Sequence, residues 1–165
     1  WAGETVSHNG RWQIENARIS PTPPTPVEVW IAASAAPAIE RAARLGDGWL
    51  AAPGLSQAEA QESLAYYVEC CTRFGRQPGV TAIRRDIYVG ADAADAQAVG
   101  GAVVAGGYRG FPSDATVVGD VERVAAEFRR YAEMGYSDVI VRNLVADQAS
   151  ALACIGRLAE VKKLI

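Results

Sequence analysis

The chain has 165 residues, of which 50% are hydrophobic, and it carries a formal net charge of -3 with an isoelectric point near 5.2. This size and composition predict one soluble globular unit with a single core, and the acidic balance argues against nucleic acid or an anionic membrane as a partner. No apolar run approaches the ~20 residues of a membrane span and nothing resembles a signal peptide, so we expect a cytoplasmic location.

The first 26 residues predict a hairpin and a connector. "TVSHNGRWQI" alternates apolar and polar residues around Asn9-Gly10, which indicates a β-hairpin within residues 1–19. His8 lies beside this turn, where a surface role is favoured over a catalytic one. Residues 20–26, "SPTPPTP", predict an extended connector because proline is excluded from helix interiors and central strands. The chain begins at Trp1, and its opening stretch does not resemble a translation start.

Residues 27–165 read as repeated strand and helix units. Val27 to Ala33 predict a buried strand, Ser34 a helix N-cap, and Gly46 the end of that helix. Trp49 to Ala52 predict the next strand, and "SQAE" at 56–59 predicts a capping box.

The pattern continues toward the C-terminus. The strand "VTAIRRDIYVG" ends at Gly90, and a short helix and the glycine-rich stretch "GGAVVAGGYRGFPSD" follow it. A helix capped by Asp120, the strand "DVIVRN" and a helix capped by Asp147 complete the chain, with Leu152, Ile155 and Leu158 expected to point inward.

The units imply an α/β fold with a parallel sheet and right-handed crossovers. Four strands and about four major helices are expected, whereas a closed (β/α)8 barrel needs eight of each. An open sheet is one possibility; the proline-rich entry favours half of a barrel, formed by residues 1–165 as a single unit.

Three segments carry a family resemblance. The luciferase-like monooxygenase superfamily has segments that resemble, in chain order, the opening "WAGETVSHNGRWQIENARISP", the stretch "PPTPVEVWIAASAAPAIERAARLGDGWL" and the late "VVGDVERVAAEFRRYAEMGYSDVIVRN" of this sequence. The resemblance implies a TIM barrel of the bacterial luciferase-like type that uses FMN or coenzyme F420. It also implies that this chain supplies about the second, C-terminal half of such a barrel.

The small residues Ala32, Ala33, Ser34, Ala35 and Ala36 are the predicted cofactor site. They follow a strand of a parallel sheet, where ligands bind, and they precede a helix whose free N–H groups and dipole favour an anion. The resemblance implies that the cofactor phosphate binds at this turn. On local sequence alone, an ordinary capped helix with alanines chosen for packing is the other interpretation.

Five further residues are candidates for substrate contact or for a lid. Arg142 and Asn143 end the last strand on the functional rim, within reach of a cofactor or substrate anion. Tyr108, Arg109 and Phe111 belong to the glycine-rich stretch and are candidates for a mobile lid, with disorder without function as the alternative.

Other distinctive residues favour structural roles. Gly46, Asp47 and Gly48 lie at the amino end of a strand, on the face that serves stability in barrels. Arg84, Arg85 and Asp86 predict an ion pair in the barrel interior, with substrate contact as the alternative. Cys70, Cys71 and Cys154 lack metal-ligand spacing, so we expect reduced, structural cysteines and no metal site.

The sequence contains no recognisable Ser-His-Asp set, paired carboxylate site or phosphate P-loop, which fits a flavin-type enzyme whose cofactor carries the redox chemistry. We expect an oxidoreductase or monooxygenase that acts on a small organic substrate, with reduced FMN and oxygen or with F420 by hydride transfer. No catalytic residue is assigned. We expect a homodimer or other homo-oligomer for the full-length protein and no activity for this fragment alone. A non-catalytic cofactor-binding module, or a structural half-barrel that needs a partner chain, is the alternative.

Overall fold

The computed structural model describes residues 2–165. Its strands are β1 (Val6–Asn9), β2 (Gln13–Ala17), β3 (Trp30–Ala32), β4 (Gly48–Ala51), β5 (Val80–Val89), β6 (Thr116–Gly119) and β7 (Asp138–Asn143). Its longer helices are α1 (Ala36–Leu45), α2 (Gln57–Arg73), α5 (Val121–Met134) and α6 (Gln148–Val161). Short helical turns follow β5, namely α3 (Ala93–Asp95), η1 (Ala96–Gly101), α4 (Ala102–Ala105), η2 (Tyr108–Gly110) and η3 (Ser113–Ala115). None of the helices in this range combines the length and the apolar composition of a membrane span.

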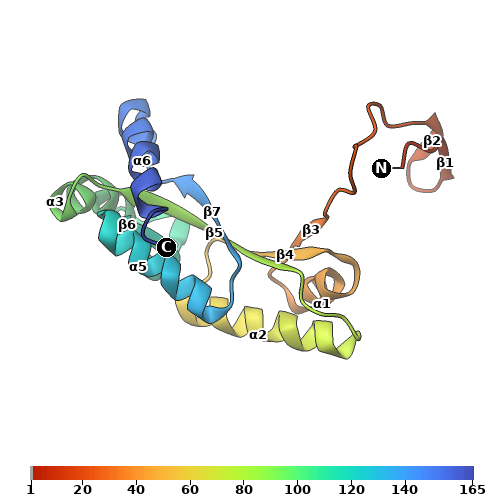
Figure 1. Cartoon of the computed structure of the whole chain (residues 1–165), viewed down its shortest axis with the longest axis horizontal. Helices are drawn as coiled ribbons and strands as arrows, with labels where there is room; N and C mark the ends of the chain where they lie inside the picture. The colour runs from red at the N-terminus through yellow and green to blue at the C-terminus, as the bar shows by residue number, and fades with distance from the viewer. Residues whose placement is uncertain (1) are drawn as a thin grey trace.

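A five-stranded parallel sheet is built around β5 (Figure 1). β4 pairs with the first half of β5, from Gly48↔Val80 to Ala51↔Ile83, and β3 pairs with β4. β7 pairs with the opposite edge of β5, where Ile83 also meets Val139. The parallel sheet predicted from the alternation of strands and helices is therefore present.

The strand β6 was not predicted, so the expected number of four strands in this sheet was one too low. β6 pairs with the last part of β5, from Asp86↔Thr116 to Val89↔Gly119. It lies on the same edge of β5 as β4, which pairs with the first part of that strand. Its sequence, "TVVG", is too short and too close to the glycine-rich stretch to reveal an alternating pattern. It forms because β5 extends past the end of β4 and leaves backbone groups to pair.

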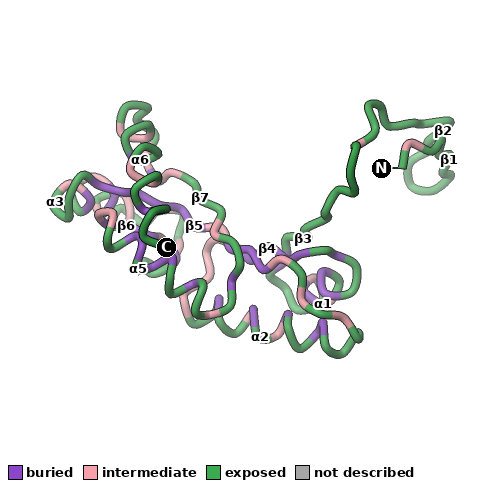
Figure 2. The backbone as a smooth tube through the Cα atoms, viewed as in Figure 1, coloured by how far each residue is buried: buried purple, intermediate pink, exposed green. Residues whose placement is uncertain are grey.

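The core lies between the sheet and the helices. The fully buried Trp49 of β4 stacks on Tyr67 of α2, with ring centroids 5.1 Å apart, and on Tyr136, with centroids 6.2 Å apart. Ile83 and Ile87 of β5 are also buried, and Figure 2 shows β4 and β5 as mostly buried. Each such side chain contributes about 1.5–3 kcal/mol by leaving water, so β4 and β5 anchor the fold.

Arg85 is a fully buried charge on the helix side of β5. Its Nη1 donates to the carbonyl oxygens of Pro53 at 2.9 Å and Leu55 at 2.8 Å, and its guanidinium lies 4.8 Å from the ring centroid of Tyr131. It therefore fastens the loop between β4 and α2 to the core. The predicted interior ion pair is wrong for Arg85, because successive residues of a strand point to opposite faces and Asp86 lies on the other one.

The main helices begin and end where local chemistry predicts. The Ser56 hydroxyl accepts the Glu59 N–H at 3.2 Å and the Glu59 carboxylate accepts the Ser56 N–H at 2.8 Å, which is the expected capping box. Asp120 and Asp147 cap α5 and α6. Gly135 ends α5 with φ at 106°, in the left-handed region that favours glycine.

The hairpin and the connector are present as predicted. β1 and β2 pair antiparallel, with Asn9 opposite Gln13, and residues 20–26 form no helix or strand. In Figure 1 the hairpin lies apart from the sheet, at the end of this connector. Trp1, the first residue of the predicted 1–19 segment, lies outside the described residues.

The first strand of the sheet is shorter and more exposed than predicted. Val27 to Ala33 was expected to be buried, but only Trp30–Ala32 pair with β4, and Val27 and Val29 are exposed. The reason is that β3 is an edge strand, with a neighbour on one side only among residues 2–165. An edge strand keeps its apolar sequence without gaining burial.

The last helix buries only part of the predicted face: Leu158 is half-buried and packs against the core, as predicted. Leu152 and Ile155 were expected to point inward, yet they are 61% and 57% exposed, while Cys154 and Val161 are buried. The Cys154 thiol accepts the N–H of Val89 at 3.2 Å, which fixes the orientation of α6. The helix carries two apolar stripes, and the sheet covers only one of them.

Candidate functional site

A pocket of about 420 Å³ lies at the carboxyl ends of β3 and β4, where the chain turns into α1. This is the edge at which parallel α/β folds bind ligands. Four of the five predicted cofactor residues, all except Ala36, belong to its walls. The lining consists of Ala32, Ala33, Ser34, Ala35, Ala38, Leu50, Ala51, Ala52, Pro53 and Arg84.

Three consecutive backbone N–H groups at this turn have no acceptor within residues 2–165, namely those of Ser34, Ala35 and Ala36. Ala35 is the N-cap of α1 in an extended conformation, and no side chain caps the helix. Pro37 follows and has no N–H to satisfy. Unpaired amides at the positive end of a helix dipole attract anions, so the turn can bind one.

Ser34 is not the N-cap that the sequence predicted. The helix begins one residue later, because the Ala35 carbonyl accepts the N–H groups of Ala38 at 2.8 Å and Ile39 at 3.0 Å. The Ser34 side chain is therefore not used by the helix. It lines the pocket instead, where its hydroxyl can donate to a ligand.

The turn is held from behind by Trp49. The indole Nε1 donates to the Ala33 carbonyl at 2.9 Å in a buried contact, and the Ala33 N–H donates to Leu50 at 3.2 Å. Because Trp49 is fixed by its stacking in the core, it fixes the backbone of the turn as well. No pattern in the sequence assigns this role to Trp49; the one local signal for it is that this tryptophan directly follows the turn Gly46–Gly48.

The stretch Gly46–Gly48 is a structural turn, as predicted. The Asp47 carboxylate accepts the Val29 N–H at 2.9 Å, and the Asp47 N–H donates to the Val29 carbonyl at 2.9 Å. A Cβ on Gly48 would lie 2.9 Å from the Val80 carbonyl oxygen, so only glycine fits there. These residues connect α1 to β4, and Asp47 binds the residue before β3, at the edge of the sheet opposite the pocket.

An ion pair lies on the open face of β5. Arg84 and Asp86 are two residues apart and so share this face, and the Arg84 Nε lies 3.1 Å from the Asp86 Oδ1. Asp86 is fully buried, whereas the Arg84 side chain is 29% exposed and reaches the pocket. The predicted interior ion pair is confirmed for these two residues.

Two of the three predicted lid residues dock onto this face. The Tyr108 hydroxyl donates to the Asp86 Oδ2 at 2.8 Å, and its ring packs edge-on against Phe111 with centroids 6.0 Å apart. Phe111 lies over Gly54, where an added Cβ would come within 2.9 Å of the ring. The Arg109 guanidinium lies 5.8 Å from the Phe111 ring centroid. That this segment opens and closes stays a prediction.

Burial raises the pKa of the Tyr108 hydroxyl, and its hydrogen bond to Asp86 raises the pKa further. Ionised Tyr108 would place a second negative charge beside the carboxylate. Tyr108 therefore acts as a neutral donor at physiological pH, and both carboxylate oxygens of Asp86 are occupied, one by Arg84 and one by Tyr108.

Arg142 and Asn143 point to opposite faces of β7. Arg142 is in register with Asp86, so it shares the open face and is exposed. Asn143 is in register with Ile87 on the helix side; its Oδ1 accepts the Val145 N–H at 3.1 Å, and its Nδ2 is buried without a partner in the described part of the chain. Arg142 therefore lies toward the candidate site, and Asn143 does not.

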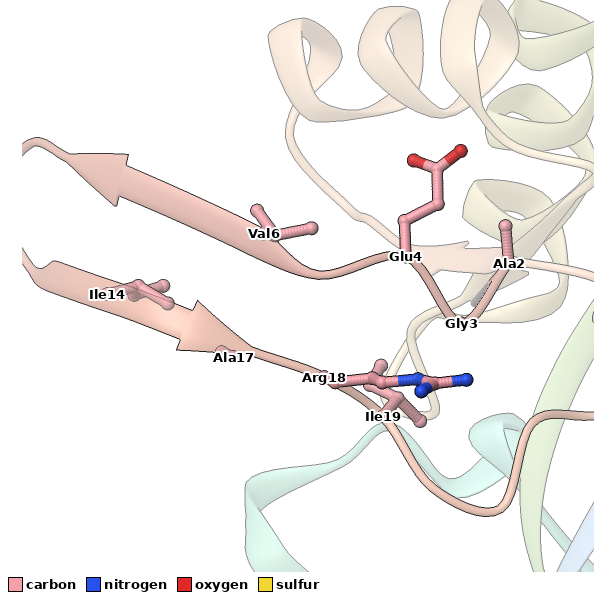
Figure 3. Close-up of a pocket in the computed structure, with 8 residues that line it drawn as sticks. All are labelled: Ala2, Gly3, Glu4, Val6, Ile14, Ala17, Arg18 and Ile19. Carbon is pink, nitrogen blue, oxygen red and sulfur yellow. The ribbon is translucent and has the colours of Figure 1, made fainter.

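A second hollow, of about 290 Å³, lies on the hairpin (Figure 3). Val6 and Ile14 line it from neighbouring strands, and the side chains of Glu4 and Arg18 point in different directions. None of the predicted site residues belongs to it. His8 is exposed on β1, as expected for a surface histidine.

The three cysteines Cys70, Cys71 and Cys154 are buried and unbridged. Burial raises the pKa of the Cys71 and Cys154 thiols, which keeps both protonated and unreactive. Across residues 2–165, no cluster of three or more histidine, cysteine or acidic side chains has the arrangement of a metal site.

Several solved structures share this fold. The monooxygenase RslO1 from Streptomyces bottropensis is 20% identical with a TM-score of 0.73, over 97% of this chain and 55% of that one. An F420-dependent secondary alcohol dehydrogenase solved with an F420-acetone adduct is 15% identical with a TM-score of 0.70, over 98% of this chain and 55% of that one. The oxygenating constituent of 3,6-diketocamphane monooxygenase from Pseudomonas putida, solved with FMN, is 12% identical with a TM-score of 0.62, over 97% of this chain and 58% of that one. At such identities the likeness establishes the fold alone, which is that of a partial luciferase-like TIM barrel.

This chain spans about 55% of the length of the first two of these structures. A search of curated proteins gave no significant match. The family model described as luciferase-like monooxygenase matches residues 1–112, a range that contains the hairpin, the connector and the pocket turn. The chain therefore belongs to the luciferase-like monooxygenase family.

Proposed function

We propose that the chain supplies the second half of the barrel of a flavin-type oxidoreductase that acts on a small organic substrate. The reaction is a monooxygenation with reduced FMN and oxygen, or a hydride transfer with coenzyme F420. The family match supports this proposal, and so do similar folds solved with FMN and with an F420 adduct. The similar structures include one solved with FMN and one solved with an F420 adduct, so the proposal includes both cofactors.

The observation that carries the proposal is the donor set at the turn before α1. Ser34, with its amide and hydroxyl, the Ala35 amide and the Arg84 guanidinium belong to residues that line one pocket with otherwise small, apolar walls, and the unpaired Ala36 amide follows in the same turn. Such a set matches a phosphate, which is an anion with several acceptor oxygens and which approaches backbone amides only where side chains are small. FMN and F420 both carry a phosphate group, so the residues fit either cofactor.

The bound cofactor would supply the redox chemistry, which this chain does not contain in its side chains. The chain's own part is to bind the phosphate end and to orient the rest of the cofactor across the open face of the sheet. Tyr108 and Phe111 would cover that face and limit the entry of water. Arg142 lies on the same face, where it would contact an anionic substrate or cofactor group.

A structural half-barrel that needs a partner chain is the second candidate. The exposed apolar side chains of the outer strands, such as Trp30 of β3 and Ile140 of β7, favour it. The mass of the intact natural protein separates the two, because a polypeptide of about twice this length would supply its own first half. Reconstitution with FMN and with F420 then tests binding, and no cofactor absorbance would support a structural role alone.

The phosphate turn is tested by Ser34→Glu in the whole protein. The carboxylate would occupy the position of the phosphate and would remove a donor, so we expect cofactor affinity to fall about ten-fold or more with the fold intact. Ser34→Ala is the matched control: it removes the hydroxyl alone and should cost only about two- to three-fold. Unchanged affinity for Ser34→Glu in a fluorescence titration would exclude this turn as the phosphate site.

A further inference from the structure

We propose that Arg84 is the side chain by which the pocket selects a phosphorylated ligand, and that Asp86 is the positioning residue that holds it there. This inference rests on the proposed function, because it assigns specificity within the same pocket. Neither residue belongs to the turn that binds the phosphate through its backbone.

Arg84 has unused hydrogen-bond donors at the pocket. It lines the pocket together with Ser34, and only its Nε is engaged, by the Asp86 carboxylate at 3.1 Å. Its Nη1 and Nη2 have no protein partner within the described chain. A guanidinium bound through Nε keeps its outer edge free, and that edge suits two oxygens of one phosphate.

The neighbouring Arg85 shows what a purely structural arginine looks like on the same strand. Arg85 is fully buried on the helix side, and its Nη1 donates to the carbonyl oxygens of Pro53 and Leu55. Arg84 makes no such contact with a backbone carbonyl in the described residues. Its partly exposed position at the pocket therefore serves something other than the packing of the core.

Asp86 fixes the direction in which Arg84 points. The carboxylate is fully buried, and its two oxygens have different partners, the Arg84 Nε and the Tyr108 hydroxyl at 2.8 Å. Because Tyr108 occupies one oxygen, a single position remains for the guanidinium. Asp86 also places a negative charge behind Arg84, which lowers the positive potential that a phosphate meets in the pocket. The pair thus combines an oriented donor with a reduced net charge.

These opposing effects predict whether FMN affinity rises or falls in single and double variants of the whole protein. Arg84→Gln should weaken FMN binding about ten-fold or more, because it removes the donor and leaves an uncompensated carboxylate near the phosphate. Asp86→Asn keeps an acceptor for the Arg84 Nε but removes the negative charge, so it should tighten FMN binding about two- to three-fold. In Arg84→Gln/Asp86→Asn the repulsion is absent but the donor is still missing, so FMN affinity should recover only part of the loss seen in Arg84→Gln and should stay below that of Asp86→Asn.

The readout is the ratio of dissociation constants for a phosphorylated ligand and its phosphate-free form. FMN against riboflavin, and F420 against its deazaflavin core without phosphate, serve as the two probe pairs in fluorescence titrations. Arg84→Gln should change the affinity for riboflavin or the deazaflavin core by less than about two-fold, since neither reaches Arg84 with an anion. Arg44→Gln, at the far end of α1, removes the same charge outside the pocket and should leave the ratio unchanged.

The outcomes separate the inference from the proposed function. A wild-type protein without preference for the phosphorylated member of either pair contradicts the phosphate turn, and the role of Arg84 is rejected with it. A wild type that prefers FMN or F420, together with an unchanged ratio in Arg84→Gln, overturns the role of Arg84 and leaves the turn standing. Asp86→Ala removes both the charge and the acceptor that holds the Arg84 Nε. The same ratio in Asp86→Ala as in Asp86→Asn would reject the positioning role, because Arg84 would then select the phosphate without an acceptor behind it.

Discussion

The middle and outer strands of the sheet have similarly apolar sequences and very different surroundings. Every residue of β5 is buried or half-buried, whereas β7 leaves Ile140 and Val141 exposed and β3 leaves Trp30 exposed. The difference is the number of neighbours: β5 has a strand on both edges, and β3 and β7 each pair on one edge within residues 2–165. An apolar strand sequence therefore indicates that the strand is buried in the complete protein. Whether it is already buried within this chain depends on how many neighbouring strands the chain itself contains.

The strongest test of this comparison is to express residues 1–165 alone. Outer strands of this kind are normally covered, and their unpaired backbone groups cost about 1–3 kcal/mol each if they are buried without partners. Several such unpaired groups together would cost an amount comparable with the ~5–15 kcal/mol free energy of unfolding of a whole domain. We expect aggregation, a molten state or dimers formed through β3 and β7, and no activity with any flavin. Light scattering and amide spectra would check this; a monomer with sharp, dispersed amide signals that melts cooperatively would show that the two outer strands need no cover.

A pair of substitutions in the whole protein sharpens the comparison. Ile83→Ala on the fully buried β5 should lower the free energy of unfolding by about 2–5 kcal/mol, through lost burial and the cavity that remains. Ile140→Ala on β7 should cost at least about 1 kcal/mol if the proposed first half of the barrel covers this strand. A cost within about 0.5 kcal/mol, the usual value for a surface site, would mean that Ile140 is as exposed in the whole protein as it is in this chain. Denaturant unfolding measures both.

A smaller effect should appear at alkaline pH. Burial, and then contact with Cys71, raises the pKa of Tyr67 from 10.0 to about 12. Between these values the unfolded chain loses the Tyr67 proton before the folded one does, so the free energy of unfolding should be intact below pH ~10 and should fall as the pH rises toward 12. Tyr67→Phe should flatten this fall. An equally steep decline in that variant would assign the effect to another group.

The order of the strands and helices was predictable because it depends on local patterns. Asp120 and Asp147 at the helix starts and Gly135 at a helix end each act through neighbouring residues, so the sequence alone locates them. The short strand β6 was missed because its four residues form a strand only through pairing with β5. The exposure of Leu152 and Ile155 was missed for a related reason, since an apolar stripe does not say which surface covers it.

The candidate site, too, was predictable only where it depends on local sequence. The stretch Ala32–Ala36 was found from its small residues before a helix, and four of these five residues line the pocket. The helix start was placed one residue early, at Ser34, because serine is a strong N-cap and the sequence does not reveal that its side chain faces the pocket. The contact between Tyr108 and Asp86 joins residues 22 positions apart, and no local spacing predicts such a pair.

The hydrogen bond from Trp49 to the pocket turn gives the protein a built-in optical sensor. Trp49 is fully buried and its indole N–H is bound to Ala33, so its fluorescence should be blue-shifted, whereas Trp12 at 72% exposure and the partly exposed Trp30 should emit as in water. Excitation at the red edge of the indole band, with the other tryptophans replaced by phenylalanine, would isolate this one emitter. A ligand that moves the Ala33 carbonyl would change the polarity that the excited indole experiences. The emission wavelength of Trp49, which does not line the pocket, would then report whether a ligand is bound there.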